Sequence, residues 1–347
     1  MTEVAQSAGP VLIGLNGLVV SNAERHWLRH PAVGGVVLFT RNYVEPGQLA
    51  DLSASIMAIA GRRLLICVDH EGGRVQRFIP GFTRLPPVGV LGQMYDKSSA
   101  TALDFAYRHA RVMATELRLC GVDLSFAPVL DINAVSLVIG DRAFAKQTDT
   151  IIELARAYIA GMHDAGMMAT GKHFPGHGSV AADSHTDAVR DPRFFEQIEQ
   201  SDLKPFTALS ADLDAMMMAH VIYPVVDEFP AGYSAYWIQS VLRQKLAFSG
   251  AVFSDDLGMH AAGMVQSMDE RVRVSLTAGC DAVLVCDPGD VERLLSHTDE
   301  AFANAGPALL RLRGRAVASR DELERVGEWR QWKESIKQLG KEQSRWT

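Results

Sequence analysis

A short segment, 171–187 (GKHFPGHGSVAADSHTD), concentrates side chains that could do acid–base chemistry or bind a metal. Three histidines, two aspartates and a lysine fall within the 16 residues 172–187. His173 and His177 have the four-residue spacing of a zinc-binding helix, but the proline and glycines around them disfavour a helix. A metal-dependent hydrolase that uses His173, His177 and His185 is therefore an alternative, and the leading interpretation has no metal.

Asp183 and His185 lie two residues apart in the same predicted loop. In an extended stretch, side chains at this spacing point to the same side. A carboxylate beside an imidazole fixes the tautomer of the ring and raises its proton affinity. Such a pair could donate a proton and then recover it. A structural ion pair is the alternative, and the density of polar groups nearby favours catalysis.

A second segment, 251–259 (AVFSDDLGM), places Asp255 and Asp256 at the predicted end of a strand. Neighbouring side chains on a strand point in opposite directions. We therefore expect at most one of these carboxylates to point into a site, while the other could cap the following helix. Spacing alone leaves open which is which.

A third segment, 67–78 (CVDHEGGRVQRF), combines Asp69 with Arg74 and Arg77 across a pair of glycines. Arg142 lies in a similar polar loop, GDRAF. Carboxylates and arginines together supply the acceptors and donors that sugar hydroxyls need. Salt bridges at the ends of strands are the alternative.

Short apolar runs alternate with longer amphipathic stretches along the chain, which is typical of parallel α/β folds. Helices are expected at 48–60, 102–119, 151–165, 237–246 and 268–278. Eight runs favour a closed barrel, so we predict a single-domain (β/α)8 TIM-type barrel with extra C-terminal helices. The catalytic domain is expected to be 1–347, with its core at about 10–300 and helices in 301–347 packing on the barrel. The runs are 11–15, 35–39, 64–68, 124–128, 168–171, 215–219, 251–253 and 282–285.

Polar residues follow almost every one of these runs. In a barrel all strand ends converge on one face, and that face carries the active site. Neither GxGxxG after a strand nor GxxxxGK[ST] is present, which disfavours nucleotide binding. The polar residues are Asn16, Thr40 to Asn42, Asp69 to Glu71, Asp131, Lys172, His173, His220, Ser254 to Asp256 and Asp287.

The composition is that of a soluble globular enzyme, with 22% charged and 48% hydrophobic residues. The formal net charge, 34 − 41 = −7, disfavours a nucleic-acid partner. No signal peptide is visible and no apolar stretch reaches the ~18 residues of a membrane span, so we expect a cytoplasmic protein without membrane partner. The acidic charge and the absence of a strong apolar stripe favour a monomer. Reduced, buried thiols are expected at Cys67, Cys120, Cys280 and Cys286.

The strings DHEGGRVQRF, GDRAF, KHFPGHG, DSHTD and FSDDLGM occur together in this order. This set resembles the family 3 glycoside hydrolases and, more narrowly, the single-domain bacterial β-N-acetylhexosaminidases of peptidoglycan recycling. The similarity covers about residues 10–300, and several long motifs agree at once. The fold of that family is a (β/α)8 barrel, in agreement with the strand count.

The resemblance implies roles for individual residues. Asp255 would be the nucleophile, His185 the acid/base, and Asp183 the partner of His185. The implied reaction is hydrolysis, with net retention, of terminal β-1,4-linked N-acetylglucosamine from 1,6-anhydro-N-acetylmuramic acid, with or without its peptide. No cofactor is implied, and the expected partner is this small muropeptide substrate. The implied substrate-binding residues are Asp69, Arg77, Arg142, Lys172 and His173.

Three other functions remain as alternatives. Larger family 3 β-glucosidases take a glutamate acid/base from a second domain, and this chain is too short to include that domain. Phosphorolysis, with phosphate as the acceptor, is left open by the sequence. A sugar-binding barrel without catalysis would not need Asp183, His185 and Asp255 together.

Overall fold

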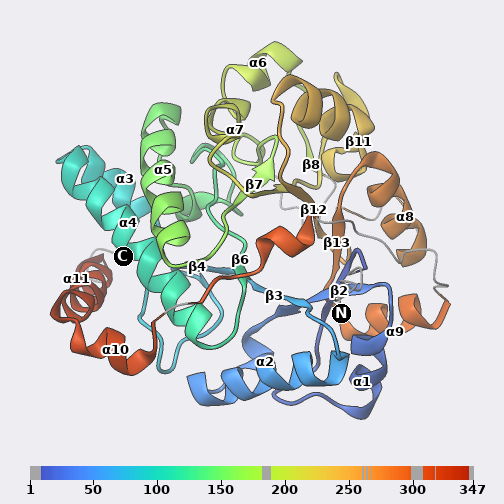
Figure 1. Ribbon diagram of the computed structural model, residues 1–347. Helices are drawn as coiled ribbons and strands as arrows, with labels where there is room; N and C mark the ends of the chain where they lie inside the picture. Colours follow the sequence, from blue (N-terminus) through green and yellow to red (C-terminus); the bar gives the residue numbers. More distant parts are fainter. Residues whose placement is uncertain are drawn as a thin grey trace.

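The computed structural model describes residues 9–181, 189–259, 262, 265, 267–297, 308–316 and 318–343. Its centre is a barrel of eight parallel strands, and every predicted strand is present, with shifted ends (Figure 1). The strands are β1 (Val11–Gly14), β2 (Val33–Leu38), β3 (Leu65–Val68), β6 (Leu124–Ser125), β7 (Thr170–Phe174), β9 (Ala215–Met218), β12 (Ala251–Asp256) and β13 (Ala282–Val285).

The order of the strands across the sheet is β6, β3, β2, β1, β13, β12, β9, β7. Each barrel strand therefore pairs with the barrel strands before and after it along the chain, and the last strand, β13, pairs with the first, β1. A parallel bridge between Val129 and Lys172 joins the two ends of this sheet. The amide of Leu130 also donates to the carbonyl of Lys172 at 2.8 Å. The predicted (β/α)8 barrel is therefore confirmed.

Alternate residues of the strands face two different apolar layers. Leu12 of β1 belongs to the cluster inside the barrel, whereas Val11 and Ile13 pack toward the surrounding helices. Inside the barrel, the rings of Phe126 and Phe253 meet edge to face, with centroids 5.5 Å apart. Burial on both faces explains why the strands read as continuous apolar runs.

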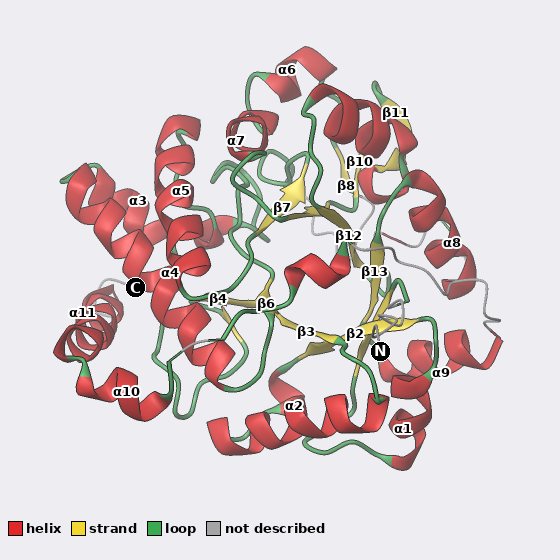
Figure 2. Cartoon of the chain, in the orientation of Figure 1, coloured by secondary structure: helices red, strands yellow, loops and turns green. Residues whose placement is uncertain are grey.

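Helices form the outer layer around the strands (Figure 2). The predicted helices at 48–60, 102–119, 151–165 and 268–278 correspond to α2, α4, α5 and α8, and the one at 237–246 is the π-helix η4. The outer layer comprises α1 (Asn22–Arg29), α2 (Pro46–Ala60), α3 (Gly89–Tyr95), α4 (Ser99–Leu119), α5 (Thr148–Asp164), α6 (Phe195–Glu199), α7 (Leu203–Leu209), η4 (Tyr236–Lys245), α8 (Met268–Ala278) and α9 (Pro288–His297).

Local sequence signals set several of these helix ends. Ser21 and Glu24 form a capping box at the start of α1, which satisfies free N–H groups of the first turn. Pro46 begins α2, where its fixed φ suits a first helical position, and Ser98 caps α4.

The C-terminal part of the chain covers the outside and one end of the barrel. The short helix η7 (Leu309–Leu312) adds Leu309 and Leu312 to the interior cluster. Helices α10 (Arg320–Arg325) and α11 (Gly327–Gln343) follow, and α11 lies beside α4 at the edge of the molecule (Figure 1). Trp329 of α11 is buried, and the ring of Trp332 stands edge-on to Tyr107 at 6.1 Å.

Smaller elements decorate the loops. β4 (His70–Gly72) and β5 (Val75–Gln76) form a hairpin after β3, and β8 (Val189–Arg190), β10 (Val221–Tyr223) and β11 (Asp227–Pro230) form a small sheet. The 3-10 turns η1 (Thr40–Asn42), η2 (Gly140–Arg142) and η3 (Ala231–Tyr233) complete the described elements. All four cysteines are free and buried, as predicted. Among the described helices, none has the length and apolar character needed to cross a membrane.

Candidate active site

A cavity of about 270 Å³ lies at the carboxyl ends of the barrel strands. Six of the residues to which the family resemblance assigns a role line it together: Asp69, Arg77, Arg142, Lys172, His173 and Asp255. They lie on β7 and β12 and in the segments that follow β3, β5 and β6, as expected for a barrel of this kind. Asp183 and His185 lie outside the described residues. The cavity is completed by Arg74, Val75, Val138, Ile139, His177, Met217 and Met259.

Lys172 stands at the centre of a buried ionic network. Its Nζ donates to Oδ1 of Asp69 at 2.7 Å and lies 2.6 Å from Oε1 of Glu71. Arg142 grips the same Glu71 carboxylate with two bonds of 2.8 Å, from Nε and from Nη2. Glu71 is 5% exposed and does not line the cavity. It therefore fixes the positions of two cations that do line the cavity, Lys172 and Arg142.

The charges of this network sustain one another. Burial alone would raise the pKa of Glu71, but Arg142 and Lys172 hold it well below its usual range. Burial likewise opposes the charge of Lys172, and Asp69 and Glu71 nevertheless raise its pKa. Glu71 and Lys172 therefore stay ionised at neutral pH, and the two cations that line the cavity, Lys172 and Arg142, already have their charges balanced.

A second buried carboxylate, Asp131, organises the turn after β7. Its Oδ2 accepts from Nδ1 of His173 at 2.6 Å, and its Oδ1 accepts from the amide of His177 at 2.7 Å. Burial would raise the pKa of Asp131, but His173 lowers it, so the side chain stays anionic. The bond to Nδ1 leaves Nε2 of His173 available to the cavity. Close packing of the turn requires a glycine at 178, where a Cβ would lie 2.0 Å from the carbonyl oxygen of Ile132.

Strand β7 ends later than the sequence indicates, at Phe174 instead of 171. Lys172 and His173 are neighbours on this strand, yet both line the cavity. The pairing with β9 shifts register between Gly171 and Phe174, and such irregularities re-aim side chains. The Lys172–His173 and Phe174–Pro175 peptide bonds are cis.

Asp255 and Asp256, which spacing left equivalent, occupy different surroundings. Asp255 lines the cavity and Asp256 does not. Oδ1 of Asp256 accepts instead from the amides of Gly258 at 3.0 Å and Cys286 at 3.2 Å. The amide of Asp256 donates to Oδ1 of Asp255 at 2.8 Å. As at β7, the pairing of β12 with β13 shifts register at this point, between Phe253 and Asp256.

Opposite pKa shifts separate the two carboxyl groups. Burial would raise the pKa of Asp255, but His173, His220 and the amide of Asp256 lower it, so Asp255 is ionised at neutral pH. Burial and the charge of Asp255 raise the pKa of Asp256 to about 6, although the amide of Gly258 opposes the shift. The cavity thus holds an anion whose negative charge is stabilised before any ligand binds.

His220, which follows β9, is hydrogen-bonded to the backbone at the end of β12. Its ring is buried, and Nε2 donates to the backbone carbonyl of Asp256 at 3.1 Å. Burial lowers its pKa, although the nearby Asp255 carboxylate opposes the shift. The ring therefore fixes the backbone beside Asp255 through its hydrogen bond to Asp256.

Comparisons with known proteins agree with this geometry. The profile of the glycosyl hydrolase family 3 N-terminal domain matches residues 9–304. The chain belongs to glycosyl hydrolase family 3. It is 49% identical over 334 residues to a beta-hexosaminidase of Alkalilimnicola ehrlichii, covering 95% of each chain.

Solved structures give the same picture. The crystal structure of NagZ from Neisseria gonorrhoeae in complex with N-trifluoroacetyl-D-glucosamine superposes with a TM-score of 0.89 at 40% identity, covering 96% of this chain and 98% of that one. A zinc complex of the same Neisseria protein superposes with a TM-score of 0.87 at 39% identity, covering 96% and 98%. The chain is therefore a family 3 glycoside hydrolase with the barrel of that family.

Three residues of this family 3 enzyme received no role from the sequence: Glu71, Asp131 and His220. All three follow apolar runs, so the strand-end pattern already marked them as polar residues on the catalytic face. The strand-end pattern does not predict which residues these side chains bond. Glu71 bonds Arg142, which is 71 positions away in the sequence, and Asp131 bonds His173, which is 42 positions away.

The metal-dependent alternative finds no support within the described ranges. No group of three or more histidines, cysteines, aspartates or glutamates there could hold a metal ion. Nδ1 of His173 is committed to Asp131, and the rings of His173 and His177 lie 6.1 Å apart. His185, the third histidine of that alternative, lies outside the described residues.

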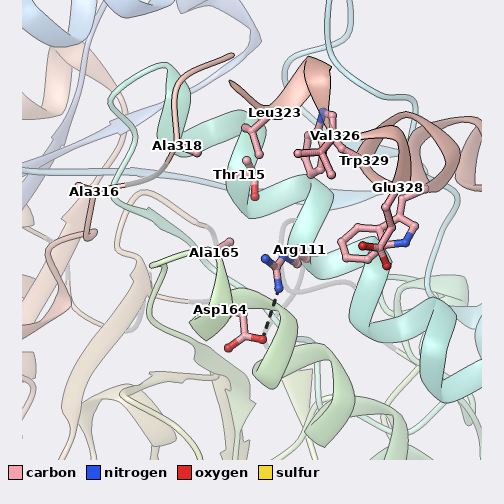
Figure 3. A pocket seen from close by; sticks show the side chains of 11 residues that line it. Arg111, Thr115, Asp164, Ala165, Ala316, Ala318, Leu323, Val326, Glu328 and Trp329 are labelled. Atoms are coloured by element: carbon pink, nitrogen blue, oxygen red, sulfur yellow. Dashed lines mark hydrogen bonds and ion pairs between the residues drawn. The ribbon is translucent and has the colours of Figure 1, made fainter. Parts of the chain in front are cut away.

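A second cavity of similar size, about 280 Å³, lies far from the strand ends, between α4, α5 and the C-terminal helices (Figure 3). Leu323, Val326 and Trp329 line one side of it, and Arg111 and Asp164 line the other. The Arg111–Asp164 ion pair measures 3.4 Å. This cavity is a gap between packed helices, and among its described lining residues there is no histidine or lysine.

Proposed function

We propose that this glycoside hydrolase is a β-N-acetylhexosaminidase that removes terminal β-1,4-linked N-acetylglucosamine from 1,6-anhydro-N-acetylmuramic acid, with or without peptide, and that it does so with net retention. Asp255 is the nucleophile, His185 is the acid/base, and Asp183 is the partner of His185. The observation that carries the proposal is the ionised Asp255 carboxylate at the wall of a cavity that is also lined by Asp69, a lysine, arginines and histidines.

The surroundings of Asp255 suit a nucleophile. A carboxylate attacks an anomeric carbon only when it is ionised, and the pKa of Asp255 is held low by His173, His220 and an amide despite burial. The amide of Asp256 donates a hydrogen bond to Oδ1 of Asp255, which favours the charged form of that carboxylate. Asp256 is unsuited to this role because it does not line the cavity, and its Oδ1 accepts from two backbone amides.

The proposed reaction has two steps. In the first, Asp255 attacks the anomeric carbon, the glycosidic bond breaks, and His185 gives its proton to the leaving oxygen. In the second, His185 takes a proton from water, which attacks the same carbon and releases Asp255. A neutral or cationic imidazole avoids the repulsion that a second carboxylate would suffer beside Asp255.

The remaining cavity groups would bind the sugar. Asp69 accepts hydrogen bonds from sugar hydroxyls, and Arg142 and Lys172 donate hydrogen bonds from positions fixed by Glu71. His173 presents Nε2 while Asp131 holds the ring. This arrangement is supported by the beta-hexosaminidase names of the relatives and by the glucosamine derivative in the Neisseria complex. Arg77, beside Phe39, completes the proposed set.

The same proposal assigns a setting to the enzyme. We propose that it acts in the cytoplasm as a monomer, in the recycling of cell-wall fragments, on a small muropeptide and without a nucleic-acid or membrane partner. The acidic net charge of −7 is consistent with a small substrate that is not a nucleic acid. Fractionation and size-exclusion chromatography with light scattering test these points directly.

Covalent trapping tests the chemistry. Incubation with a 5-fluoro N-acetylglucosaminyl fluoride, followed by proteolysis and mass spectrometry, is expected to place the sugar on the peptide that contains Asp255. In parallel, Asp255→Asn is expected to lower release of a chromogenic aryl N-acetylglucosaminide by about 10⁴-fold or more. Label on a different residue would overturn the nucleophile, and no release by the unaltered enzyme would overturn the activity itself.

A further inference from the structure

The cations around the cavity fall into two classes. Arg142 and Lys172 are neutralised by Glu71 and Asp69 at 2.6–2.8 Å. Arg74 lines the same cavity, and among the described residues no carboxylate lies within ion-pair distance of it. The cavity therefore carries a cation whose charge the described part of the chain does not balance.

The backbone turn between β4 and β5 places Arg74 at the mouth of the cavity. Gly72 and Gly73 adopt φ values of +110° and +55°, which other residues rarely reach, and a Cβ on Gly72 would lie 2.5 Å from the carbonyl oxygen of Pro86. Arg74 is exposed, and its Nη2 donates to the carbonyl of Val138, which also lines the cavity. This bond uses one of the five N–H donors of the guanidinium.

The loop to which Arg74 is hydrogen-bonded carries exposed apolar side chains. Leu137 is 86% exposed and Val135 is 57% exposed, and both closely precede Val138 in the loop after β6. Large apolar side chains at this level of exposure, in a loop bonded to a guanidinium, offer a surface for a ligand that is partly apolar and anionic. Deeper in the cavity, the paired charges suit neutral hydroxyls instead.

We infer that Arg74, with Leu137 and Val135, forms a subsite for the leaving group of the substrate and binds a carboxylate on it. This inference rests on the proposed function, in which the sugar to be released occupies the floor of the cavity and the leaving group occupies its mouth. The net charge of the chain is −7, so an anionic substrate is repelled overall. A cation at the mouth offsets that repulsion where the leaving group enters, and a charge-assisted bond orients it.

The ligand class follows from the groups at the rim. A carboxylate attached to a sugar through a short alkyl ether supplies both the anion for Arg74 and apolar carbons for Leu137 and Val135. The carboxylate side chain of a muramic acid, or the carboxylates of a peptide attached to it, fits this description. A neutral leaving group would leave Arg74 with its charge uncompensated.

The test compares two substrates that differ in one charge: N-acetylglucosaminyl-1,6-anhydro-muramic acid as the free acid, and the same disaccharide with that carboxyl converted to the methylamide. The unaltered enzyme is expected to prefer the acid by about tenfold in kcat/KM, the order of one charge-assisted hydrogen bond. Arg74→Gln is expected to reduce this preference to near unity. Added salt should weaken the preference of the unaltered enzyme and leave that of R74Q unchanged.

Arg84→Gln is the matched control. Arg84 lies near the same turn and donates to the carbonyl of Gly73 at 3.1 Å, but it does not line the cavity. R84Q should keep the acid preference. An equal ratio for the unaltered enzyme and R74Q would overturn the inference, because a ratio is insensitive to general damage. Failure of the proposed function is distinct: the unaltered enzyme would then cleave neither disaccharide nor the neutral aryl glycoside.

Discussion

The two cavities of this protein have nearly the same volume, about 270 Å³ at the strand ends and about 280 Å³ beside the C-terminal helices, but they differ in how charge is held. In the first, Glu71 and Asp131 are 5% and 0% exposed and fix several cavity side chains. In the second, Arg111 and Asp164 keep 35% and 58% of their side chains exposed, and their ion pair is 3.4 Å long.

The burial of the carboxylates distinguishes a cavity with fixed polar side chains from a packing gap between helices. A buried carboxylate with two or three short bonds fixes its partners, because losing any bond leaves a charge without solvent. A half-exposed pair fixes little, because water replaces either partner. Volume alone would not distinguish the cavities, whereas the buried carboxylates behind the first one do. If the buried carboxylates make this difference, removing one of them should cost far more activity than removing an exposed carboxylate.

Among substitutions that test this difference between the cavities, the largest effect is expected for Glu71→Gln. The amide leaves Lys172 and Arg142 without their shared anion, so both move from the positions they hold in the cavity. We expect kcat/KM on an aryl N-acetylglucosaminide to fall about 100-fold, because misplacement by about 1 Å costs that much. The free energy of unfolding should fall by about 3–5 kcal/mol, as for other broken buried ion pairs. Steady-state kinetics and urea denaturation measure the two effects.

The matched control for that prediction is Glu328→Gln at the second cavity. Glu328 lines that cavity and makes the same change of charge and shape on substitution. Its kcat/KM should stay within about twofold of the unaltered enzyme, as for surface substitutions that break no specific contact. If E71Q and E328Q were equally active, buried carboxylates would not distinguish the two cavities.

A smaller effect is expected for Asp131→Asn. The oxygen of an asparagine can still accept from the amide of His177, but its NH2 group then faces Nδ1 of His173, so the charge-assisted bond to that ring is lost. We expect KM to rise about tenfold, the order of one such bond, with a lesser change in kcat. A fall in kcat at constant KM would show that His173 acts on the transition state and not on sugar binding.

The third prediction concerns pH and stability at Asp256. Its pKa in the folded protein is about 6, raised by burial and by Asp255 from an ordinary value of 3.8. Between these two values the folded state holds a proton that the unfolded state has lost, so the stability contribution falls as pH rises from about 4 to 6. Asp256→Asn cannot ionise and should lack this decrease. Thermal unfolding of both proteins at pH 4, 5, 6 and 7 gives the comparison, and parallel curves would contradict it.

The sequence predicted which residues lie on the catalytic face of the barrel, but not which hydrogen bonds and ion pairs they form there. Apolar runs followed by polar residues located all eight strands and brought Asp69, Lys172 and Asp255 to one end of the barrel. Periodicity could not choose between Asp255 and Asp256, because the choice depends on a shift of register against β13. That shift results from pairing between strands and leaves no mark in the spacing of either strand.

The sequence predicted the C-terminal helices but not the second cavity beside them. The C-terminal stretch reads as helices that pack on the barrel, and α10 and α11 are present. Where their side chains leave a gap depends on the fit of Trp329 and Val326 against α4 and α5. Packing of that kind is set by shape, and amphipathic patterns specify only which face is buried.

The smallest effect is expected for Arg111→Gln. Nη1 of Arg111 bonds the hydroxyl of Tyr107 and reaches Asp164 at 3.4 Å, with both partners of the ion pair well exposed. Exposed pairs of this kind contribute about 0–1 kcal/mol, so the free energy of unfolding should change by no more than that. The kcat/KM should be unchanged. Urea denaturation and the aryl glycoside assay check both values. A tenfold loss of kcat/KM would mean that the second cavity is coupled to the strand-end site, and the distinction between the two cavities would fail.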